Sequence, residues 1–329
     1  MHRIEKLAEL CRSKTVYIQT HNFPDPDAIA SAFGLQKLLR HYGVESTLCY
    51  AGRIDKLSSS KMLRMFHIDI YPYDSLQDQM QESDSIICVD SQTNAGNITD
   101  FIGQEVAVID HHPTFVKAEY LYEDLRITGA CASIIAEYFT EAGLTPDPDT
   151  ATALLYGIKM DTLQFSRGVT SLDISMFAFL HPLIDPVKMK TLESNNMEFQ
   201  DLRAYGAAIE NIRVYDTVGF SCIPFSCPDA LIATISDFIL ALEEVQVSVI
   251  FSYRADGIKF SVRSEITDVH AGELIHRTLK NLGSGGGHCG MAGGLIPAQN
   301  EAMLGDHPQE RIIQLFLNEL EHIGQSNVS

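Results

Sequence analysis

The sequence predicts an α/β protein with a mostly parallel sheet carrying helices on both faces, plus a smaller C-terminal α/β domain joined by a helical linker. Two continuous apolar runs, 85–89 and 105–109, are typical of strands that are covered on both faces. Such runs alternate with stretches of helical periodicity, as expected for repeated strand–helix units. The length of 329 residues is also ample for two hydrophobic cores.

The first half of the chain contains the predicted parallel sheet. Its expected strands are 15–19, 44–50, 85–89 and 105–109, and its expected helices are 28–42, 130–142, 149–160 and 172–181. Parallel strands need a long crossover connection, and helices of this length supply it. We therefore expect residues 1–185 to form the first domain.

The second half is predicted to be a separate, smaller domain over residues 215–329. Residues 186–212 carry many charged and amide groups at helical spacing, which indicates one connecting helix within a linker of residues 186–214. Beyond this linker the expected strands are 219–223, 245–251 and 258–262, and the expected helices are 230–243, 271–280 and 309–323. Strands and helices again interleave, so this domain is also of the α/β class.

Composition limits the partners that the chain can bind. It has 24 basic and 43 acidic residues, a formal charge of −19. This charge repels long nucleic acid, whose non-specific affinity comes from neutralising many phosphates, but it allows a short phosphorylated ligand in a local site. No run of 18 apolar residues is present, so we expect no membrane span. The seven cysteines lack a CxxC pair, which favours reduced thiols and a cytoplasmic location.

Acidic and imidazole side chains follow three of the expected strands, at the points where those strands end. They are His21, Asp25, Asp27, Asp90, Asp110, His111 and His112. The carboxyl ends of parallel strands are where open α/β sheets place their ligands. We therefore expect these groups to meet at one edge of the sheet.

The chemistry indicated by this cluster is metal binding. Asp25 and Asp27 are held in one proline-stiffened loop, where two carboxylates would repel each other unless a cation neutralised them. Imidazole with carboxylate suits Mn²⁺, Co²⁺, Fe²⁺ or Zn²⁺ better than Ca²⁺. Two such ions about 3.5–4 Å apart can generate hydroxide and hold the attacking and leaving oxygens of a phosphoryl group.

Each of these residues also has an ordinary structural interpretation. Asp25 and Asp27 are typical turn formers, and Asp27 is placed to cap the helix that follows. Asp90 alone is typical of a turn that ends a strand, and His111 with His112 is compatible with a surface loop. Their joint occurrence after three successive strands favours the metal site over these separate explanations.

The glycine-rich stretch at 283–287 also has two interpretations. By default it is a flexible loop, but its small residues would let backbone N–H groups of Gly286 and Gly287 approach a phosphate, with His288 as a further donor. Arg263 ends an expected strand, where it would clamp a phosphate with two hydrogen bonds or serve as an ordinary surface arginine.

Taken together, the motifs resemble the DHH phosphoesterase superfamily with its DHH-associated C-terminal domain. The opening His21-x-x-x-Asp25-x-Asp27, then Asp90-Ser91, then Asp110-His111-His112 are similar to that family's first three motifs. The segment 157–162 resembles the fourth motif, whose aspartate is Asp161 here, and the cluster 285–288 resembles the substrate-binding motif of the second domain. The resemblance covers residues from about Thr15 to Gly294.

The resemblance implies a dinuclear site. One metal would be held by His21, Asp25 and Asp90, and the other by Asp27, Asp90, His111 and Asp161. Mn²⁺ is the metal that it implies. His112 would face the substrate as a catalytic group, with Asp110 orienting the histidines. The substrate would be bound by Arg263, Gly286, Gly287 and His288. A homodimer is also implied.

Among members of this superfamily, the two-domain layout resembles the nanoRNase type. That type implies hydrolysis of short oligoribonucleotides or of adenosine 3′,5′-bisphosphate, with metal-bridged hydroxide attacking phosphorus. The alternatives are a phosphodiesterase for cyclic di-AMP or its linear product, an exopolyphosphatase or pyrophosphatase, and a non-catalytic nucleotide-binding regulator. Pro26 and Gln164 depart from the family pattern, and Phe165 would either stack on a base or pack in the core.

Overall fold

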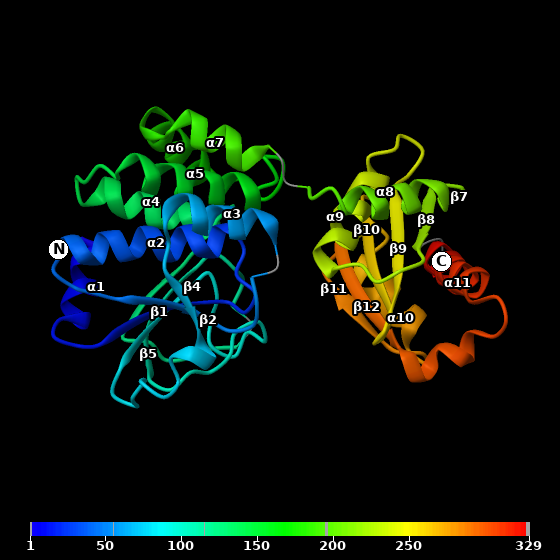
Figure 1. Cartoon of the computed structure of the whole chain (residues 1–329), viewed down its shortest axis with the longest axis horizontal. Helices are drawn as coiled ribbons and strands as arrows, with labels where there is room; N and C mark the ends of the chain where they lie inside the picture. The colour runs from blue at the N-terminus through cyan, green and yellow to red at the C-terminus, as the bar shows by residue number, and fades with distance from the viewer. Residues whose placement is uncertain (1, 55, 115, 195–196, 327–329) are drawn as a thin grey trace. The chain divides into compact units, whose positions relative to one another are not determined.

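The computed structural model describes residues 2–54, 56–114, 116–194 and 197–326. The chain divides into two compact units, Met1–Asn196 and Met197–Ser329, which are coloured blue to green and green to red in Figure 1. Each unit contains its own sheet and its own hydrophobic core. In the described part of the chain, no helix combines the length and apolar character needed to cross a membrane.

Within these ranges, six strands form the sheet of the first unit, and every neighbouring pair is parallel. Their order across the sheet is β3 (Ile70–Pro72), β2 (Thr47–Tyr50), β1 (Val16–Thr20), β4 (Ser85–Val89), β5 (Gln104–Asp110) and β6 (Tyr122–Leu125). The chain runs outward in one direction from β1 to β3 and in the other from β4 to β6. The strand order therefore reverses between β1 and β4, which is where doubly wound sheets bind their ligands.

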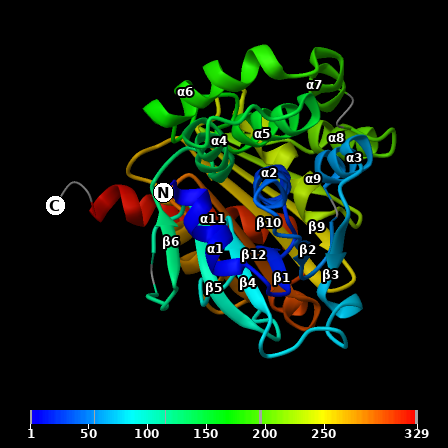
Figure 2. The same ribbon diagram turned by 90° about the vertical axis from the view of Figure 1, so that its left-hand side faces the viewer.

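Most helices of this unit pack over one face of the sheet. They are α1 (Arg3–Cys11), α2 (Pro26–His41), α3 (Leu57–Phe66), α4 (Cys131–Glu141), α5 (Pro148–Asp161), α6 (Ser171–Leu180) and α7 (Pro186–Glu193). Figures 1 and 2 both show α2, α4 and α5 on the same side of the strands. The opposite face packs against apolar side chains from the segment 73–101, which includes the short 3₁₀ helix η1 (Tyr73–Ser75).

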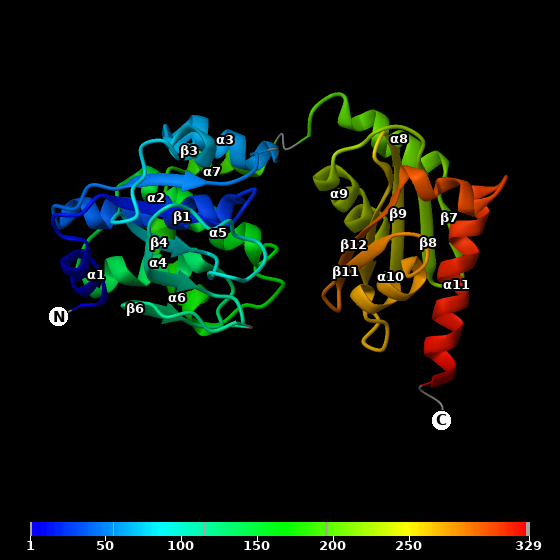
Figure 3. The same cartoon turned by 90° about the horizontal axis from the view of Figure 1, so that it is seen from below.

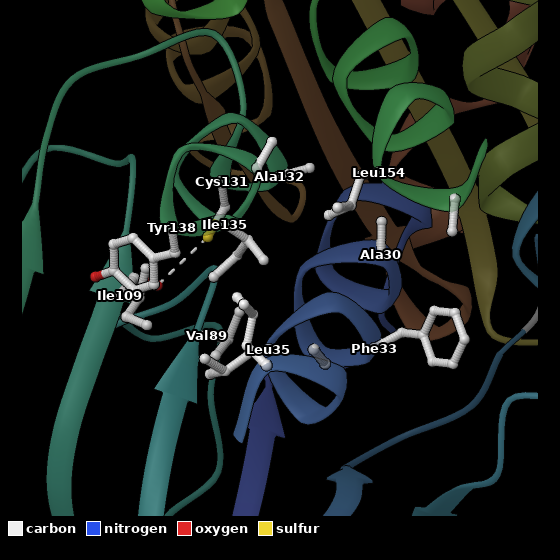
Figure 4. Close-up of a cluster of buried hydrophobic side chains, with 14 of the residues drawn as sticks. Ala30, Phe33, Leu35, Val89, Ile109, Cys131, Ala132, Ile135, Tyr138 and Leu154 are labelled. Carbon is white, nitrogen blue, oxygen red and sulfur yellow. Dashed lines mark hydrogen bonds between the residues drawn. The ribbon is translucent and has the colours of Figure 1, made fainter. Parts of the chain in front are cut away.

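The main core lies where α2, α4 and α5 meet the ends of the central strands. Figure 4 shows Leu35 of α2, Ile135 of α4 and Leu154 of α5 converging above Val89 of β4 and neighbouring strand residues. These side chains are fully buried or nearly so, and each contributes about 1.5–3 kcal/mol of transfer free energy. This core therefore fixes the positions of α2, α4 and α5 relative to the strands.

The second unit contains a mixed sheet. Its order is β11 (Ser284–Gly287), β12 (Met291–Pro297), β10 (Gly257–Ser264), β9 (Val247–Arg254), β8 (Val218–Ile223) and β7 (Arg213–Tyr215). The β8–β9 pair is parallel, and the other described pairs are antiparallel. Helices α8 (Asp201–Glu210) and α9 (Asp229–Leu240) pack with one face, and α10 (Ala271–Leu279) and α11 (Pro308–Ser326) pack with the other. Figure 3 shows α9 and α11 on opposite sides of this sheet.

The predicted mixed α/β class is confirmed, with a helix-flanked parallel sheet followed by a second α/β sheet unit. The single connecting helix predicted over 186–212 is wrong, because two helices, α7 and α8, occupy that range. Helix α7 begins at the Asp185 cap and belongs to the first unit. The described residues between the two helices, 194 and 197–200, are not helical.

The structure also describes the glycine-rich stretch and the cysteines. The stretch 283–287 is not a flexible loop, since Ser284–Gly287 forms β11 and pairs with β12. All seven cysteines lie in the described part of the chain and are free thiols, six of them buried and Cys289 exposed.

Candidate metal centre

Five elements bring the six predicted metal ligands to one edge of the parallel sheet. His21 and Asp25 follow β1, Asp90 follows β4, and His111 follows β5, all at the carboxyl ends of adjacent strands. Asp27 lies in the first turn of α2, and Asp161 is the last residue of α5. The strand-end cluster expected from the sequence is therefore one site in the structure.

The start of α2 explains how the first loop is held. Asp25 is the N-cap residue, and its Oδ1 accepts hydrogen bonds from the amides of Asp27 at 3.0 Å and Ala28 at 3.2 Å. Pro26 occupies the first helical position, where its missing N–H costs nothing. The alternative in which Asp27 caps this helix is wrong, and the Asp27 side chain is free to point elsewhere.

Asp27 instead caps a different helix. Its Oδ2 accepts the amide of Cys131 at 2.8 Å, and its Oδ1 accepts the amide of Ala132 at 2.9 Å. These are the first two residues of α4, which has no side-chain cap from its own N-cap residue, Ala130. The orphan donors of that helix terminus therefore orient both oxygens of Asp27.

Gly157 allows α5 to pass close to this aspartate. A Cβ atom at Gly157 would lie 3.2 Å from Asp27 Cα and 2.9 Å from Ala30 Cβ. Asp161 lies four residues later and so projects from the same side of α5. The close helix contact therefore brings Asp161 towards Asp27 and His111.

The ligand atoms fall into two groups that meet at Asp90. In the first group, His21 Nε2 lies 3.7 Å from Asp25 Oδ1 and 3.6 Å from Asp90 Oδ2. In the second, His111 Nε2 lies 3.9 Å from Asp27 Oδ2 and 3.3 Å from Asp161 Oδ2. His111 Nε2 is also 3.2 Å from Asp90 Oδ1. Each oxygen of Asp90 thus faces a different histidine.

Both histidines are oriented by backbone carbonyl groups. His21 Nδ1 lies 2.8 Å from the carbonyl oxygen of Asn22, and His111 Nδ1 lies 3.0 Å from that of Thr128. A carbonyl can only accept, so each Nδ1 carries the proton and donates. The Nε2 atoms then face the carboxylates, and with a cation bound the neutral rings would present their Nε2 lone pairs to it, as metal-binding histidines do.

The residues fit a bound cation. Asp90 Oδ1 is buried and accepts no hydrogen bond from any described residue, although an unpaired buried oxygen is costly. Asp90 also has a positive φ of 59°, a conformation that a non-glycine residue rarely adopts without a functional or structural reason. A divalent ion between the two groups would satisfy this oxygen and the facing Nε2 atoms.

The electrostatics of these side chains also favour a bound positive charge. Burial, reinforced by Asp90 and Asp161, raises the pKa of Asp27 well above its ordinary value. Burial likewise raises the pKa of Asp161 to about 6. Burial opposes the charged form of His111, but Asp90, Asp27 and Asp161 outweigh it and raise the pKa of His111 to about 11. All three shifts have the direction expected of a site that favours additional positive charge, which a divalent cation would supply.

His112 is held beside the centre without being one of the six ligands. Its Nδ1 donates to Asp110 Oδ1 at 2.9 Å, and its side chain is half exposed. The Asp110 hydrogen bond raises the pKa of His112. Asp110 is fixed in turn, because its Oδ2 accepts from Gln92 Nε2 at 2.7 Å and its Oδ1 accepts the His111 amide at 2.8 Å.

Several functional contacts had no signal in the sequence. Gln92 also donates to the His112 carbonyl at 3.1 Å, and Thr128 acts only through its backbone. Lys56 Nζ lies 4.0 Å from Asp25 Oδ2, and an Arg167 guanidinium nitrogen lies 3.6 Å from Asp161 Oδ1. These residues are far from one another in the sequence, so only the fold reveals their shared location.

Phe165 has the packing role rather than the free face that stacking requires. Its ring is partly buried against the main core and meets Phe177 edge-on, with ring centres 5.2 Å apart. The interpretation of Phe165 as a core aromatic therefore fits the structure.

The predicted substrate residues of the second unit lie around β11. Gly286 and Gly287 line a cavity of about 490 Å³, together with His270, Gly272, Glu273, His276 and Arg277. Arg263 lies on β10 and is not among these lining residues. Its Nε donates to Asp237 Oδ1 at 2.5 Å, and a terminal nitrogen donates to Ser261 Oγ at 3.0 Å.

Strand register nevertheless places Arg263 on the same sheet face as Gly286. Ser261 pairs with Gly293 on β12, and Gly293 pairs with Gly286 on β11, so these three share one face. Arg263 is two residues after Ser261 and shares that face as well. A Cβ atom added at Gly286 would meet nothing within 4 Å. At Gly286 and Gly293 this face is therefore bare backbone, and Arg263 lies on the same face.

The chain matches two domain families in the order that its motifs indicate. Residues 15–158 match the DHH family, N-terminal domain, and residues 216–314 match the DHHA1 domain. The chain therefore carries a DHH-family N-terminal domain followed by a DHHA1 domain. The resemblance to DHH phosphoesterases inferred from the motifs is therefore confirmed.

Similar proteins are known from several organisms. An uncharacterised protein of Methanocaldococcus jannaschii is 30% identical over 299 residues, which cover 90% of this chain but 60% of that relative. A probable bifunctional oligoribonuclease and PAP phosphatase of Streptococcus mutans is 28% identical over 318 residues, covering 84% of this chain and 97% of the relative. An exopolyphosphatase-related protein from Bacteroides fragilis has a TM-score of 0.76 at 19% identity and covers 97% of this chain and 96% of its own. This last similarity shows a shared fold.

Proposed function

We propose that this DHH-family chain is a metal-dependent phosphoesterase that hydrolyses short oligoribonucleotides, adenosine 3′,5′-bisphosphate, or both. The observation that carries the proposal is the pair of histidine–carboxylate groups that meet at the buried Asp90, whose Oδ1 accepts no hydrogen bond from the described residues. The similarity to the oligoribonuclease and PAP phosphatase of Streptococcus mutans, over 97% of its length, supports the choice of substrate.

The proposed ligands are divided between two divalent ions. His21, Asp25 and Asp90 would hold one, and Asp27, Asp90, His111 and Asp161 would hold the other. Imidazole and carboxylate together suit Mn²⁺, which we propose as the metal. Two such ions supply a water of lowered pKa and neutralise the charge of the phosphate group.

The other residues of the centre have separate tasks. His112 keeps its Nδ1 on Asp110, so its Nε2 is the nitrogen that would give a proton to the leaving oxygen. The raised pKa of His112 favours the protonated ring that this role requires. Lys56 and Arg167 place positive charge at the rim of an acidic site, where a phosphate would otherwise be repelled.

We also propose a phosphate-binding surface on the second unit. The bare face at Gly286 allows close approach of a phosphate to backbone, and Arg263 would add a cationic donor once released from Asp237. We propose Gly287 and His288 as neighbouring contacts, since they continue the same strand and its turn. A chain of net charge −19 favours a short substrate over long nucleic acid.

A substrate panel tests the proposal. Purified chain is assayed with a diribonucleotide, adenosine 3′,5′-bisphosphate, cyclic di-AMP, inorganic pyrophosphate and polyphosphate, each with Mn²⁺ and with chelator. We expect turnover of one or both of the first two, abolished by chelator. Turnover confined to pyrophosphate or polyphosphate would assign the site to the alternative reaction, and cleavage of cyclic di-AMP alone would assign it to the cyclic dinucleotide. No turnover of any substrate would favour a binding protein.

A further inference from the structure

Asp173 is a buried carboxylate outside the ligand set. It lies in the first turn of α6 and is fully buried. Its Oδ2 accepts from both the amide and the hydroxyl of Thr170, each at 2.7 Å, which is the capping arrangement at the start of that helix. Residues that only cap a helix commonly lie at the surface, and a fully buried carboxylate is costly to desolvate. Capping alone therefore does not account for its burial.

Two further hydrogen bonds connect Asp173 to a distant segment. Its Oδ2 also accepts the amide of Gly129 at 2.9 Å, and its Oδ1 accepts the hydroxyl of Ser133 at 2.6 Å. Gly129 and Ser133 flank the start of α4. A Cβ atom at Gly129 would lie 2.8 Å from Asp173 Oδ2 and 2.6 Å from Thr162 Cγ2, so the backbone and the carboxylate are in close contact.

The segment that Asp173 holds is the one that orients two metal ligands. The carbonyl of Thr128, next to Gly129, accepts the hydrogen bond that turns His111 Nε2 towards the carboxylates. The amides of Cys131 and Ala132, between Gly129 and Ser133, hold both oxygens of Asp27. The hydrogen bonds that connect Asp173, the segment 128–133, His111 and Asp27 all have ordinary lengths. Asp173 holds this segment at Gly129 and at Ser133.

We propose that Asp173 is a positioning residue for one of the two metal positions, the one formed around His111 and Asp27. It acts through the segment 128–133 and does not touch the metal or the substrate. The other position, formed by His21 and Asp25, is held by the β1 loop and the start of α2, with which Asp173 has no described hydrogen bond. The proposal rests on the metal centre proposed above and predicts that the two positions respond differently to changes at Asp173.

The physical basis is the loss of acceptors. All four partners of Asp173 are donors, so truncation leaves the Gly129 amide and the Ser133 hydroxyl buried without a partner. The segment would shift to find other acceptors, and Thr128 and the α4 amides would shift with it. Removing a group that orients a metal ligand typically weakens metal affinity by about 10- to 100-fold.

The test measures Mn²⁺ binding directly. The full chain is titrated with Mn²⁺ while free ion is followed by electron paramagnetic resonance, for wild type, Asp173→Ala and Asp173→Asn. Thr170→Ala is the matched control, because it removes part of the same helix cap but leaves the bonds to Gly129 and Ser133. His21→Ala identifies the other position, since it removes a ligand that Asp173 does not influence.

Wild type is expected to bind two Mn²⁺ ions. In Asp173→Ala one of them should bind about 10- to 100-fold more weakly while the other is unchanged. Asp173→Asn, which keeps one acceptor oxygen, should show a smaller loss of the same kind. Thr170→Ala should match wild type in both affinities even where it lowers the melting temperature. Combining Asp173→Ala with His21→Ala should weaken both positions.

Three results would overturn the proposal. One is a folded Asp173→Ala or Asp173→Asn protein that binds both ions as wild type does. Another is Thr170→Ala losing one ion as strongly as Asp173→Ala, because the effect would then come from the helix cap. The third is an equal loss at both positions. If Asp173→Ala does not fold, Asp173→Asn and Ser133→Ala carry the same comparison. Wild type that binds no Mn²⁺ would instead contradict the proposed metal centre.

Discussion

The two units present chemistry in opposite ways. In the first unit, imidazole and carboxylate groups are buried at the ends of parallel strands, and their orientation is fixed by hydrogen bonds with the surrounding backbone. In the second unit, the corresponding surface is a glycine-rich edge of a sheet, where side chains are absent and backbone is exposed. The first unit therefore depends on the identity of side chains, and the second depends on their absence.

This difference predicts that substitutions in the two units will impair the protein in different ways. A substitution at a metal ligand other than Asp25 and Asp27, which also cap helices, should lower the reaction rate while leaving the fold intact, because these ligands are not part of the hydrophobic core cluster. A substitution at the glycine-rich edge should act through shape, either by blocking a ligand or by straining the strand. The following expectations test this contrast, beginning with the largest effect.

Asp90→Asn is expected to cause the greatest loss. Asp90 is the carboxylate that both histidine groups share, so the variant weakens both proposed metal positions. Metal ions contribute several kcal/mol to such reactions, so kcat should fall about 10³-fold or more. Initial rates with saturating Mn²⁺ measure this, and circular dichroism confirms the fold. Retention of full Mn²⁺-dependent turnover would remove Asp90 from the centre.

His112→Ala should cause the next largest loss while leaving metal binding intact. General acid catalysis typically contributes about 10²- to 10⁴-fold, so kcat should fall by about 10²-fold or more. A substrate with a good leaving group, such as a p-nitrophenyl phosphate ester, needs less protonation and should be hydrolysed with a smaller loss. If His112→Ala is equally slow on both kinds of substrate, proton donation is not its role.

Gly286→Ala and Gly287→Ala form a matched pair in the second unit. Gly286 has open space where a Cβ would be added, so the alanine variant should keep its stability within about 0.5 kcal/mol. Because the methyl group would occupy the proposed ligand surface, KM should rise while kcat changes little. Steady-state kinetics on the active substrate measure both quantities. An unchanged KM would place the substrate elsewhere.

Gly287→Ala should instead destabilise the second unit. Gly287 has φ of 153°, and an added Cβ would lie 2.5 Å from the carbonyl oxygen of Met291. Substitution where the native backbone conformation excludes a side chain costs more than about 1 kcal/mol. Chemical denaturation of both variants side by side measures the difference. Equal stability of the two variants would contradict the strand geometry described for β11.

The smallest expected effect is on the stability of the metal-free protein. Asp90→Asn removes a buried charge that repels Asp27 and Asp161, but it also removes the charge that attracts His21 and His111. Because these two contributions oppose each other, the variant without metal should melt within a few degrees of wild type. Added Mn²⁺ should raise the melting temperature of wild type above that of the variant, because it stabilises only a protein that binds it. Thermal unfolding with chelator and with Mn²⁺ measures both halves.

The sequence was most informative where chemistry repeats at strand ends. His21, Asp25, Asp90 and His111 could be grouped because each follows an apolar run, and parallel strands bring such residues together. Asp161 ends a helix and has no such signal, so it was found only through resemblance to a family. The mixed α/β class was predicted on the same grounds as the strand-end residues.

Other features depend on contacts between distant segments. Gln92, Thr128 and Asp173 are ordinary polar residues whose partners lie elsewhere in the sequence, so periodicity and motifs cannot single them out. The glycine-rich stretch was expected as a loop by default, since its pairing with β12 is decided by register and not by strand propensity. The single helix predicted over 186–212 is wrong, because charged and amide residues at helical spacing also occur across residues 197–200, which are not helical.

The hydrogen bonds between Asp27 and the start of α4 have an evolutionary consequence. Helix α4 has Ala130 at its N-cap position, so a residue of the proposed reaction centre also completes a helix terminus more than 100 residues away in the sequence. A descendant that abandoned catalysis would still be under selection to keep this aspartate. It would be released only by acquiring serine, threonine, aspartate or asparagine at position 130. Persistence of Asp27 in a lineage is therefore weak evidence that the lineage is still enzymatic, whereas persistence of His21 is stronger evidence.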